Sequence, residues 1–298
     1  MPDQITEQNN RVTIVTGANS GIGFDTARML AKSGATVVLA CRDCAKAEQA
    51  KNQIAHSADA DALHVMELDL SRLQSVRDFS KSYRERFNRL DLLINNAGLM
   101  MPPYTVTEDG FECQIGVNYL AHFALTAYLL PLLEQTPASR IVTLSSVGHK
   151  RGKIHFEDLH FKNHYNKGAA YCQSKLACLM FSFELQMRLQ ANNYQTISVG
   201  AHPGVSDTNL GRYFPRLFAW VFKSLSQSSE QGALPTLYAA LGNDIVGGDY
   251  CGPDGFLDWR GSPAKSGYKP HASDPEACKK LWELSEQLTG VQMFGHTT

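Results

Sequence analysis

The 298-residue chain lacks an excess of charge of either sign: 28 Lys and Arg are balanced by 29 Asp and Glu, which gives a net charge of −1 at pH 7. A surface that binds nucleic acid or an anionic membrane needs a basic excess, so the composition predicts neither as a partner. Long apolar runs are also missing. The stretch from Phe123 to Leu133 is interrupted by Thr126 and Pro131, well short of the ~20 residues that span a bilayer. We therefore predict no transmembrane segment.

Cysteine is scattered rather than clustered. Of the seven cysteines, only Cys41 and Cys44 form a close pair, and no second pair or histidine cluster accompanies them. The pattern therefore predicts no metal site, and it is typical of free thiols in a reducing compartment. The first ten residues, MPDQITEQNN, are polar and carry no secretory signal. We expect residues 1–10 to be disordered and the protein to be cytoplasmic.

Apolar segments alternate with helical patterns along the rest of the chain. Continuous apolar runs, rather than an in-out alternation, are typical of a parallel sheet that is covered on both faces. The sequence therefore predicts an α/β fold with one domain, 11–298, built on a doubly wound parallel sheet (a Rossmann fold). Strands are expected at 12–16, 36–41, 63–68, 90–95, 140–145, 195–201 and near 256–257. Helices are expected at 23–33, 44–56, 71–87, 111–134, 171–192 and 229–241.

The first strand runs directly into a glycine-rich turn, Thr16-Gly-Ala-Asn-Ser-Gly-Ile-Gly23. Glycines at 17, 21 and 23 permit a tight turn and let a pyrophosphate approach backbone N–H groups at a helix N-terminus, where the helix dipole favours an anion. The turn lies between a predicted strand and a predicted helix, which is the context that distinguishes a dinucleotide-binding turn from an ordinary loop.

The spacing of these glycines resembles the TGxxxGxG motif of the short-chain dehydrogenase/reductase family. The resemblance continues in chain order with Asn95-Asn96-Ala97-Gly98, with Tyr171-Cys-Gln-Ser-Lys175, and with Pro203-Gly204 after the sixth strand. It covers nearly the whole chain, and it implies hydride transfer between nicotinamide and a carbonyl or alcohol carbon. It also implies a set of dinucleotide contacts: Gly17, Asn19, Ser20, Gly21, Ile22, Gly23, Asp69 at the adenine, Asn96, Tyr171, Lys175, and Thr208 at the carboxamide.

The end of the second strand indicates which dinucleotide binds. An acidic residue there would bind the ribose 2′-hydroxyl of NAD, whereas an Arg just beyond it suits the 2′-phosphate of NADP. Here the strand ends at Cys41 and the next residue is Arg42, whose planar guanidinium matches phosphate oxygens. The sequence favours NADP over NAD, and the alternative is an Arg42 that points into solvent.

Four side chains form the catalytic set that the resemblance implies. Tyr171 and Lys175 are four residues apart, so a helix places them on one face. A nearby ammonium would lower the pKa of the phenol and let Tyr171 exchange a proton with the substrate oxygen. Ser146, the second Ser of the pair at 145–146, would polarise that oxygen. Asn118 would anchor a water that connects Lys175 to solvent, although its stripe (Gln114, Asn118, His122, Thr126) could also serve buried polar neighbours.

Two segments depart from the simplest family pattern. The interval from Ser146 to Tyr171 is 25 residues, longer than in classical members and similar to the retinol dehydrogenase and protochlorophyllide reductase branch. The segment around 205–230 corresponds to the family's substrate lid and is rich in aromatic and aliphatic residues between 213 and 225. We expect a lipophilic substrate, with a homodimer contact or a membrane-touching surface as alternatives for this stretch. A dinucleotide-binding regulator without turnover is the competing function.

Overall fold

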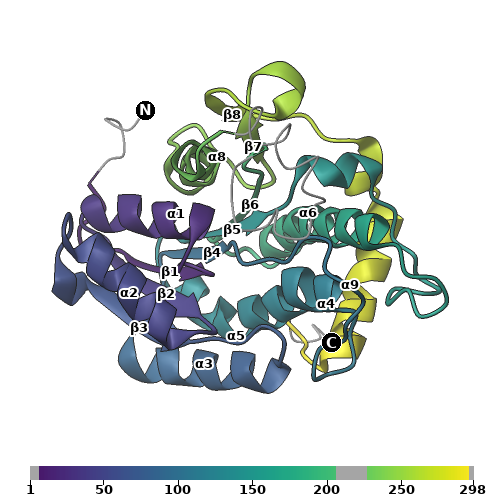
Figure 1. The fold of residues 1–298 in the computed structure, drawn as a ribbon, viewed down its shortest axis with the longest axis horizontal. Coiled ribbons are helices and arrows are strands. Elements are labelled where there is room, and N and C mark those ends of the chain that lie inside the picture. Colours follow the sequence, from purple (N-terminus) through teal and green to yellow (C-terminus); the bar gives the residue numbers. More distant parts are fainter. Residues whose placement is uncertain (1–6, 206–226, 295–298) are drawn as a thin grey trace.

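The computed structural model describes residues 7–294 except 206–226. Its core is one eight-stranded sheet with the order β3-β2-β1-β4-β5-β6-β7-β8 (Figure 1). All neighbours from β3 to β7 are parallel, and β8 is antiparallel to β7. The strands are β1 Val12–Thr16, β2 Thr36–Cys41, β3 Leu63–Glu67, β4 Leu92–Asn95, β5 Arg140–Leu144, β6 Ile197–Ala201, β7 Tyr250–Pro253 and β8 Pro263–Lys265. The predicted doubly wound parallel sheet is confirmed.

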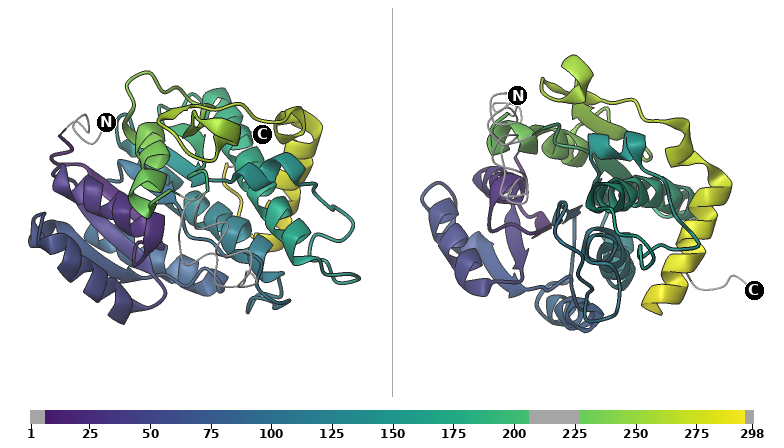
Figure 2. Two further views of the ribbon diagram at one scale, coloured as in Figure 1. Left: turned by 45° about the horizontal axis from the view of Figure 1, so that its top comes forward. Right: turned by 45° about the vertical axis from the view of Figure 1, so that its right-hand side comes forward.

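Helices cover both faces of this sheet and form two apolar cores with it. One face carries α1 Gly21–Lys32, α2 Cys44–Ala55 and α8 Ser229–Leu241. The other face carries α3 Leu73–Arg86, α5 Ala121–Gln135, α6 Lys167–Ala191 and α9 Pro275–Thr289. In Figure 2, α9 (yellow) lies along the outside of α6 (teal). Because the strands are covered on both sides, their residues are apolar without alternation.

The strand order reverses between β1 and β4, so the connections that follow these two neighbouring strands lead in opposite directions along the sheet. Ligands of such sheets bind in the crevice at this reversal. The glycine-rich turn after β1, the segment after β4 and the serine pair after β5 all lie at this edge. The fold thus gathers the predicted site residues from distant parts of the sequence.

One prediction near the C-terminus was wrong. The strand expected near 256–257 is a 3-10 turn, Phe256–Asp258, in which Leu257 and Asp258 have positive φ values of 55° and 59°. The strand at this end of the sheet is β7, a few residues earlier. Its sequence, YCGP, is not a continuous apolar run, so it gives no strand signal. Gly252 is required there because a Cβ would collide with the His202 ring.

The helix α9 was not predicted, although its boundaries carry strong signals. Asp274 caps its first turn by accepting from the Ala277 N–H, Pro275 occupies the first position, and Gly290 ends the helix at φ 67°. Its buried Trp282 packs against Phe123 and other aromatic rings of α5 and α6. The helix thus closes one end of the larger core.

The start of the described chain is packed rather than free. Gln8 is buried, and its backbone N–H donates to Ser33 O (2.7 Å) at the end of α1. The described residues 7–10 belong to the segment 1–10 that was expected to be disordered, and Gln8 in this segment is packed against the end of α1. The predicted lid around 205–230 lies almost entirely outside the described residues, and so does Thr208.

Candidate active site

The turn after β1 is built around close backbone approaches. Gly17 and Gly21 have φ values of 67° and 56°, which side chains disfavour. A Cβ on Gly23 would lie 2.5 Å from Gly17 O, so only glycine lets α1 begin this close to the turn. Asn96, after β4, donates from Nδ2 to Thr16 O (2.7 Å) and holds the turn in place. These contacts fix the shape of the turn.

The first turn of α1 fits a phosphate group. Ser20 is the N-cap, but within the described part of the chain its hydroxyl accepts none of the first-turn N–H groups. The first turn of α1 also contains no acidic residue that could compete with an anion. Helix N-termini with free N–H groups bind phosphates, so the predicted positions Asn19, Ser20 and Ile22 are suitably arranged for a dinucleotide.

The end of β2 presents one exposed cation. Arg42 is exposed, and within the described residues no carboxylate forms an ion pair with it. The adjacent Asp43 is already engaged, because its carboxylate caps α2 and pairs with Lys46 Nζ (2.7 Å). Cys41 is buried, and its sulfur accepts hydrogen bonds from the backbone N–H groups of Ala18 and Asn19. No carboxylate stands at the tip of this strand.

Asp69, predicted at the adenine, follows β3 by two residues. Its carboxylate accepts from the Ser71 N–H (2.9 Å) and the Ser71 hydroxyl (2.7 Å), and its backbone N–H donates to Ser75 Oγ (3.0 Å). The side chain is therefore held rigidly at the edge of the sheet. The other carboxylate oxygen lies 3.7 Å from Arg72 Nε, so an adenine contact would have to share that oxygen or use a neighbouring backbone group.

The structure brings Tyr171 and Ser146 together. Burial raises the pKa of Tyr171 to about 12, and a hydrogen bond with Ser146 lowers it in part. The other serine of the pair, Ser145, donates its hydroxyl proton to Lys175 O (2.7 Å) and is almost fully buried. A Cβ at Gly148 would lie 3.4 Å from Tyr171 Cε1 and 3.6 Å from Ser146 Oγ, so Ser146, the residue chosen from the sequence, lies near the phenol ring.

Lys175 and Asn118 meet beside Gly98, next to this pair. A Cβ at Gly98 would lie 3.2 Å from Asn118 Oδ1 and 3.5 Å from Lys175 Nζ. Lys175 Nζ donates to Leu144 O (3.0 Å), and burial lowers the pKa of this lysine. The pKa of Tyr171 is raised by burial, so a lowering by the neighbouring ammonium does not outweigh the burial of the phenol.

Asn118 sits on a π-helical turn, Gly116–Leu120, between α4 Cys113–Ile115 and α5. Such turns often occur at functional sites because they redirect one side chain. Its amide accepts from the Leu99 N–H (2.7 Å) and donates to Leu99 O (3.0 Å) and to Ser174 Oγ (2.9 Å). The Asn118 side chain thereby connects the segment after β4 to α6. It therefore also serves buried polar neighbours, which was the alternative for the polar stripe.

The comparisons with known proteins agree with this geometry. The sequence model of the short chain dehydrogenase family matches residues 11–216. The chain belongs to the short-chain dehydrogenase family. It is 41% identical over 285 residues to human (Homo sapiens) retinol dehydrogenase 11, covering 94% of this chain and 86% of that protein. It is 42% identical over 301 residues to retinol dehydrogenase 14 of Mus musculus, covering 95% and 87%.

A solved structure supports the same assignment. An uncharacterised protein from Mycobacterium paratuberculosis superposes with a TM-score of 0.84 at 40% identity, covering 99% of both chains. The predicted resemblance to the retinol dehydrogenase branch is confirmed. The chain is thus an NAD(P)-dependent short-chain dehydrogenase that acts on alcohol and carbonyl groups.

Two residues of this short-chain dehydrogenase were not assigned to the site from its sequence. Thr16 Oγ1 accepts from the Asn96 and Ala97 N–H groups (both 2.9 Å). His122 faces Asn118 O with Nδ1 (3.0 Å) and Thr16 Oγ1 with Nε2 (2.9 Å). Since a carbonyl can only accept, Nδ1 carries the proton and Nε2 accepts from Thr16. The four-residue periodicity that included His122 was the signal for this link.

The long interval before Tyr171 in this short-chain dehydrogenase wraps around the start of α4. Tyr165 donates to Pro102 O (3.1 Å) and contacts Glu112 Oε1 (3.2 Å), while Gln114 Nε2 donates to Tyr165 Oη (3.0 Å). Gln114 Oε1 accepts from the Met101 N–H (2.8 Å), and Met101 has a positive φ of 52°. No group of three or more metal-ligating side chains lies within the described residues.

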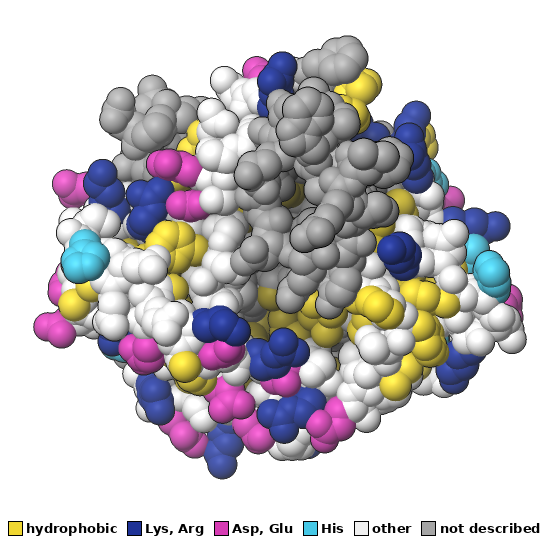
Figure 3. All heavy atoms as spheres, in the orientation of Figure 1, with side chains coloured by type: hydrophobic (Ala, Val, Ile, Leu, Met, Phe, Trp, Pro, Cys, Tyr) yellow, Lys and Arg dark blue, Asp and Glu magenta, His cyan; other side chains and the backbone are white. Residues whose placement is uncertain are grey.

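This network fixes an apolar segment beside the catalytic residues. Leu99, Met100 and Met101 are half-buried, while Tyr104 is 43% and Val106 54% exposed. Figure 3 shows hydrophobic side chains gathered next to the grey segment. A Cβ at Gly168 would lie 3.9 Å from the Met101 methyl group, one helical turn from Tyr171. We call residues 99–106 the apolar wall.

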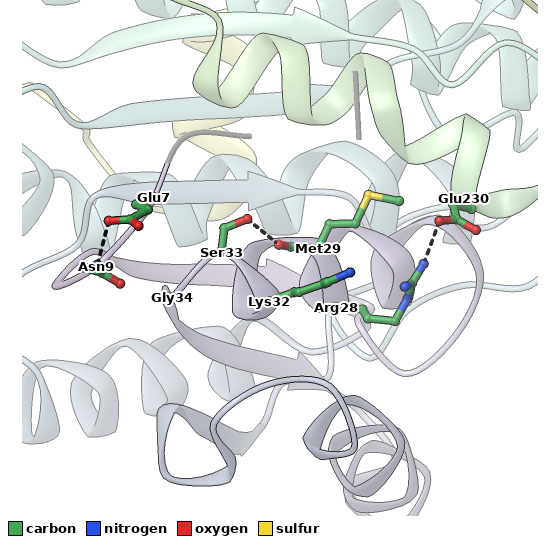
Figure 4. Close-up of a pocket in the computed structure, with 8 residues that line it drawn as sticks. All are labelled: Glu7, Asn9, Arg28, Met29, Lys32, Ser33, Gly34 and Glu230. Atoms are coloured by element: carbon green, nitrogen blue, oxygen red, sulfur yellow. Dashed lines mark hydrogen bonds and ion pairs between the residues drawn. The ribbon is translucent and has the colours of Figure 1, made fainter. Parts of the chain in front are cut away.

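Two other features of this short-chain dehydrogenase lie outside the site. A cavity of about 400 Å³ between α1 and the start of α8 contains the ion pair of Arg28 with Glu230 (3.1 Å), and its described lining includes none of the catalytic residues (Figure 4). By length and composition alone, one described helix, Cys113–Gln135, could cross a membrane. Its most apolar stretch is 83% buried, as in a core helix.

Proposed function

We propose that this oxidoreductase uses NADP rather than NAD and interconverts a lipophilic alcohol with its aldehyde or ketone. The observation that supports the cofactor choice is Arg42, an exposed cation without an ion-pair partner in the described structure. The guanidinium can bind the 2′-phosphate without giving up an internal contact. Cys41 offers a buried thiol where NAD binding calls for a carboxylate.

The catalytic roles follow from the protonation states. When bound, the dinucleotide supplies or accepts the hydride. Because the pKa of Tyr171 is raised to about 12, its phenol is protonated at neutral pH and can donate to a carbonyl oxygen. Ser146 hydrogen-bonds the phenol and can polarise the same substrate oxygen. The raised pKa of Tyr171 favours carbonyl reduction unless the bound dinucleotide lowers it.

Lys175 and Asn118 complete the proposed set. Lys175 Nζ lies beside Asn118 Oδ1 at Gly98, where we place the nicotinamide ribose. Its charge would stabilise a Tyr171 phenolate as the proton leaves. Asn118 orients the neighbouring backbone at Leu99, and we propose that it also anchors the water that resupplies the proton.

The apolar wall supports a lipophilic substrate. Pockets for such molecules are lined by hydrophobic side chains around a few polar groups, and the wall provides the former next to Tyr171. The relatives named retinol dehydrogenases point to a retinoid-like substrate. The free cysteines among the described residues support a reducing, cytoplasmic location, which cell fractionation tests.

The test is a panel of aldehydes of increasing chain length, followed through nicotinamide absorbance with NADPH and with NADH. We expect turnover with NADPH, and a kcat/KM that rises with chain length up to retinal. Equal or better turnover with NADH contradicts the cofactor choice, and a preference for short polar aldehydes contradicts the substrate class. Binding of NADPH without turnover on any carbonyl would support the competing regulator.

A further inference from the structure

Behind the serine pair lies a buried imidazole that the mechanism has not used. His149, in the 3-10 turn Val147–Arg151 (η4), is fully buried, and its Nδ1 lies 2.7 Å from Ser146 O. The same residue accepts a hydrogen bond at its own carbonyl from His271 Nε2 (3.2 Å). The ring therefore contacts the backbone of the residue whose hydroxyl reaches Tyr171.

The partners of His149 define its tautomer. A carbonyl oxygen can only accept, so Nδ1 carries the proton and donates to Ser146 O. In the described residues Nε2 is buried and has no hydrogen-bond partner. Burial lowers the pKa of His149, which keeps the ring neutral. An unpaired buried nitrogen costs free energy, so packing alone does not explain a histidine here. Among the described residues, the ring makes its two polar contacts at Nδ1, with Ser146 O at 2.7 Å and with Tyr250 Oη at 3.3 Å.

Tyr250, at the start of β7, holds the other serine. Its ring is perpendicular to the His149 ring at 5.3 Å between centroids, and its hydroxyl lies 3.3 Å from His149 Nδ1. Burial raises the pKa of Tyr250, and a hydrogen bond with the Ser145 side chain lowers it in part. Because Ser145 donates its only proton to Lys175 O, it accepts from Tyr250. Both serines after β5 are thus held by side chains from other parts of the fold: Tyr250 contacts the Ser145 hydroxyl, and His149 contacts the Ser146 carbonyl.

We propose that His149 is a positioning residue that holds the backbone of Ser146 so that its hydroxyl points at Tyr171 and the substrate oxygen. Ser146 Oγ also accepts from the Gly148 N–H (3.1 Å) in the same turn. The turn and the Nδ1 bond together restrict the serine to one orientation. Ser146 O also accepts from the His149 backbone N–H (3.0 Å), so loss of the Nδ1 bond leaves the turn itself in place. It weakens the hold on the Ser146 backbone and widens the range of orientations of the Ser146 hydroxyl, while the apolar wall and the dinucleotide turn stay unchanged.

The two ring nitrogens allow a matched pair of substitutions. His149→Asn places an amide N–H at the position of Nδ1 and deletes the unpaired Nε2, whereas His149→Gln places its amide near Nε2 and loses the Nδ1 donor. We expect His149→Asn to keep kcat within about threefold, and His149→Gln and His149→Leu to lower kcat about tenfold or more, with little change in KM. Melting temperatures of all three are measured alongside. If Asn and Gln lower kcat equally, or kcat only follows the melting temperature, the inference is wrong.

A double-mutant cycle tests whether His149 acts through Ser146. Ser146→Ala alone should lower kcat about a hundredfold, the low end for losing a donor to a reacting oxygen. In that background His149→Leu should have no further effect, since nothing remains to be positioned. The inference rests on the proposed role of Ser146, and the cycle separates the two. A normal kcat for Ser146→Ala overturns that role and the inference with it. A reduced kcat for Ser146→Ala with a normal kcat for His149→Leu, or with additive losses, overturns the inference alone.

Discussion

Replacing Arg42 by Ala tests the cofactor choice at one exposed side chain. Within the described structure Arg42 forms no ion pair, and Asp43 is bound to Lys46. The substitution therefore removes no internal contact, and the melting temperature should not change. A charge-assisted hydrogen bond contributes about 1.5–3 kcal/mol, or about tenfold to a hundredfold in affinity. Because solvent screens an exposed Arg, we expect the lower end for NADPH.

The assay is the dissociation constant of each dinucleotide, measured by nicotinamide fluorescence on both proteins. Arg42→Ala should weaken NADPH about tenfold and leave NADH nearly unchanged. Adding Cys41→Asp should shift the preference to NADH, because a carboxylate at the strand tip repels the 2′-phosphate and accepts from the 2′-hydroxyl. Wild-type protein that already prefers NADH, or an equal loss for both dinucleotides, would refute the assignment of Arg42.

Three further predictions follow from the buried groups. Lys175→Met should weaken NADPH binding and turnover together, and normal NADPH affinity in this variant would exclude its ribose role. Tyr165→Phe removes the hydrogen bonds that hold the apolar wall and should lower kcat/KM for long-chain aldehydes several-fold while sparing short ones; equal effects on both would show that the wall does not contact substrate. Burial lowers the pKa of His122 to about 4 and of His202 to about 3, against ~6.5 in the unfolded chain. The unfolded state therefore binds more protons below pH ~6.5, so the melting temperature should fall between pH 7.5 and pH 5; an unchanged value would contradict this.

The central part of the fold could be predicted because its signals are local. The apolar runs of β1, β2 and β5, together with the glycines of the first turn, predict buried strands and a tight turn from neighbouring residues alone. The choice of Ser146 over Ser145 stays a prediction; in the structure a hydrogen bond with Ser146 lowers the pKa of Tyr171 in part, whereas the Ser145 hydroxyl donates to Lys175 O. The strand β7 escaped prediction because Gly252 and Pro253 are poor strand formers, and its glycine is required by a distant ring, His202.

Tertiary contacts explain what else was missed. The pKa of Tyr171 depends on burial, which a four-residue spacing from Lys175 does not reveal. The roles of His149 and Tyr165 depend on partners across the fold: His149 meets Tyr250 from β7, and Tyr165 meets Pro102 after β4. In the sequence both lie in an interval notable only for its length and its histidines.

The most direct test of the account compares wild-type protein with Tyr171→Phe, which keeps the buried ring and removes the hydroxyl. NADPH binding is measured by fluorescence, and reduction of retinal is followed by NADPH oxidation. We predict an unchanged NADPH dissociation constant and a turnover lowered at least ~100-fold, the low end for a positioned acid–base group. Near-normal turnover by Tyr171→Phe would contradict the assignment of this phenol as the proton donor.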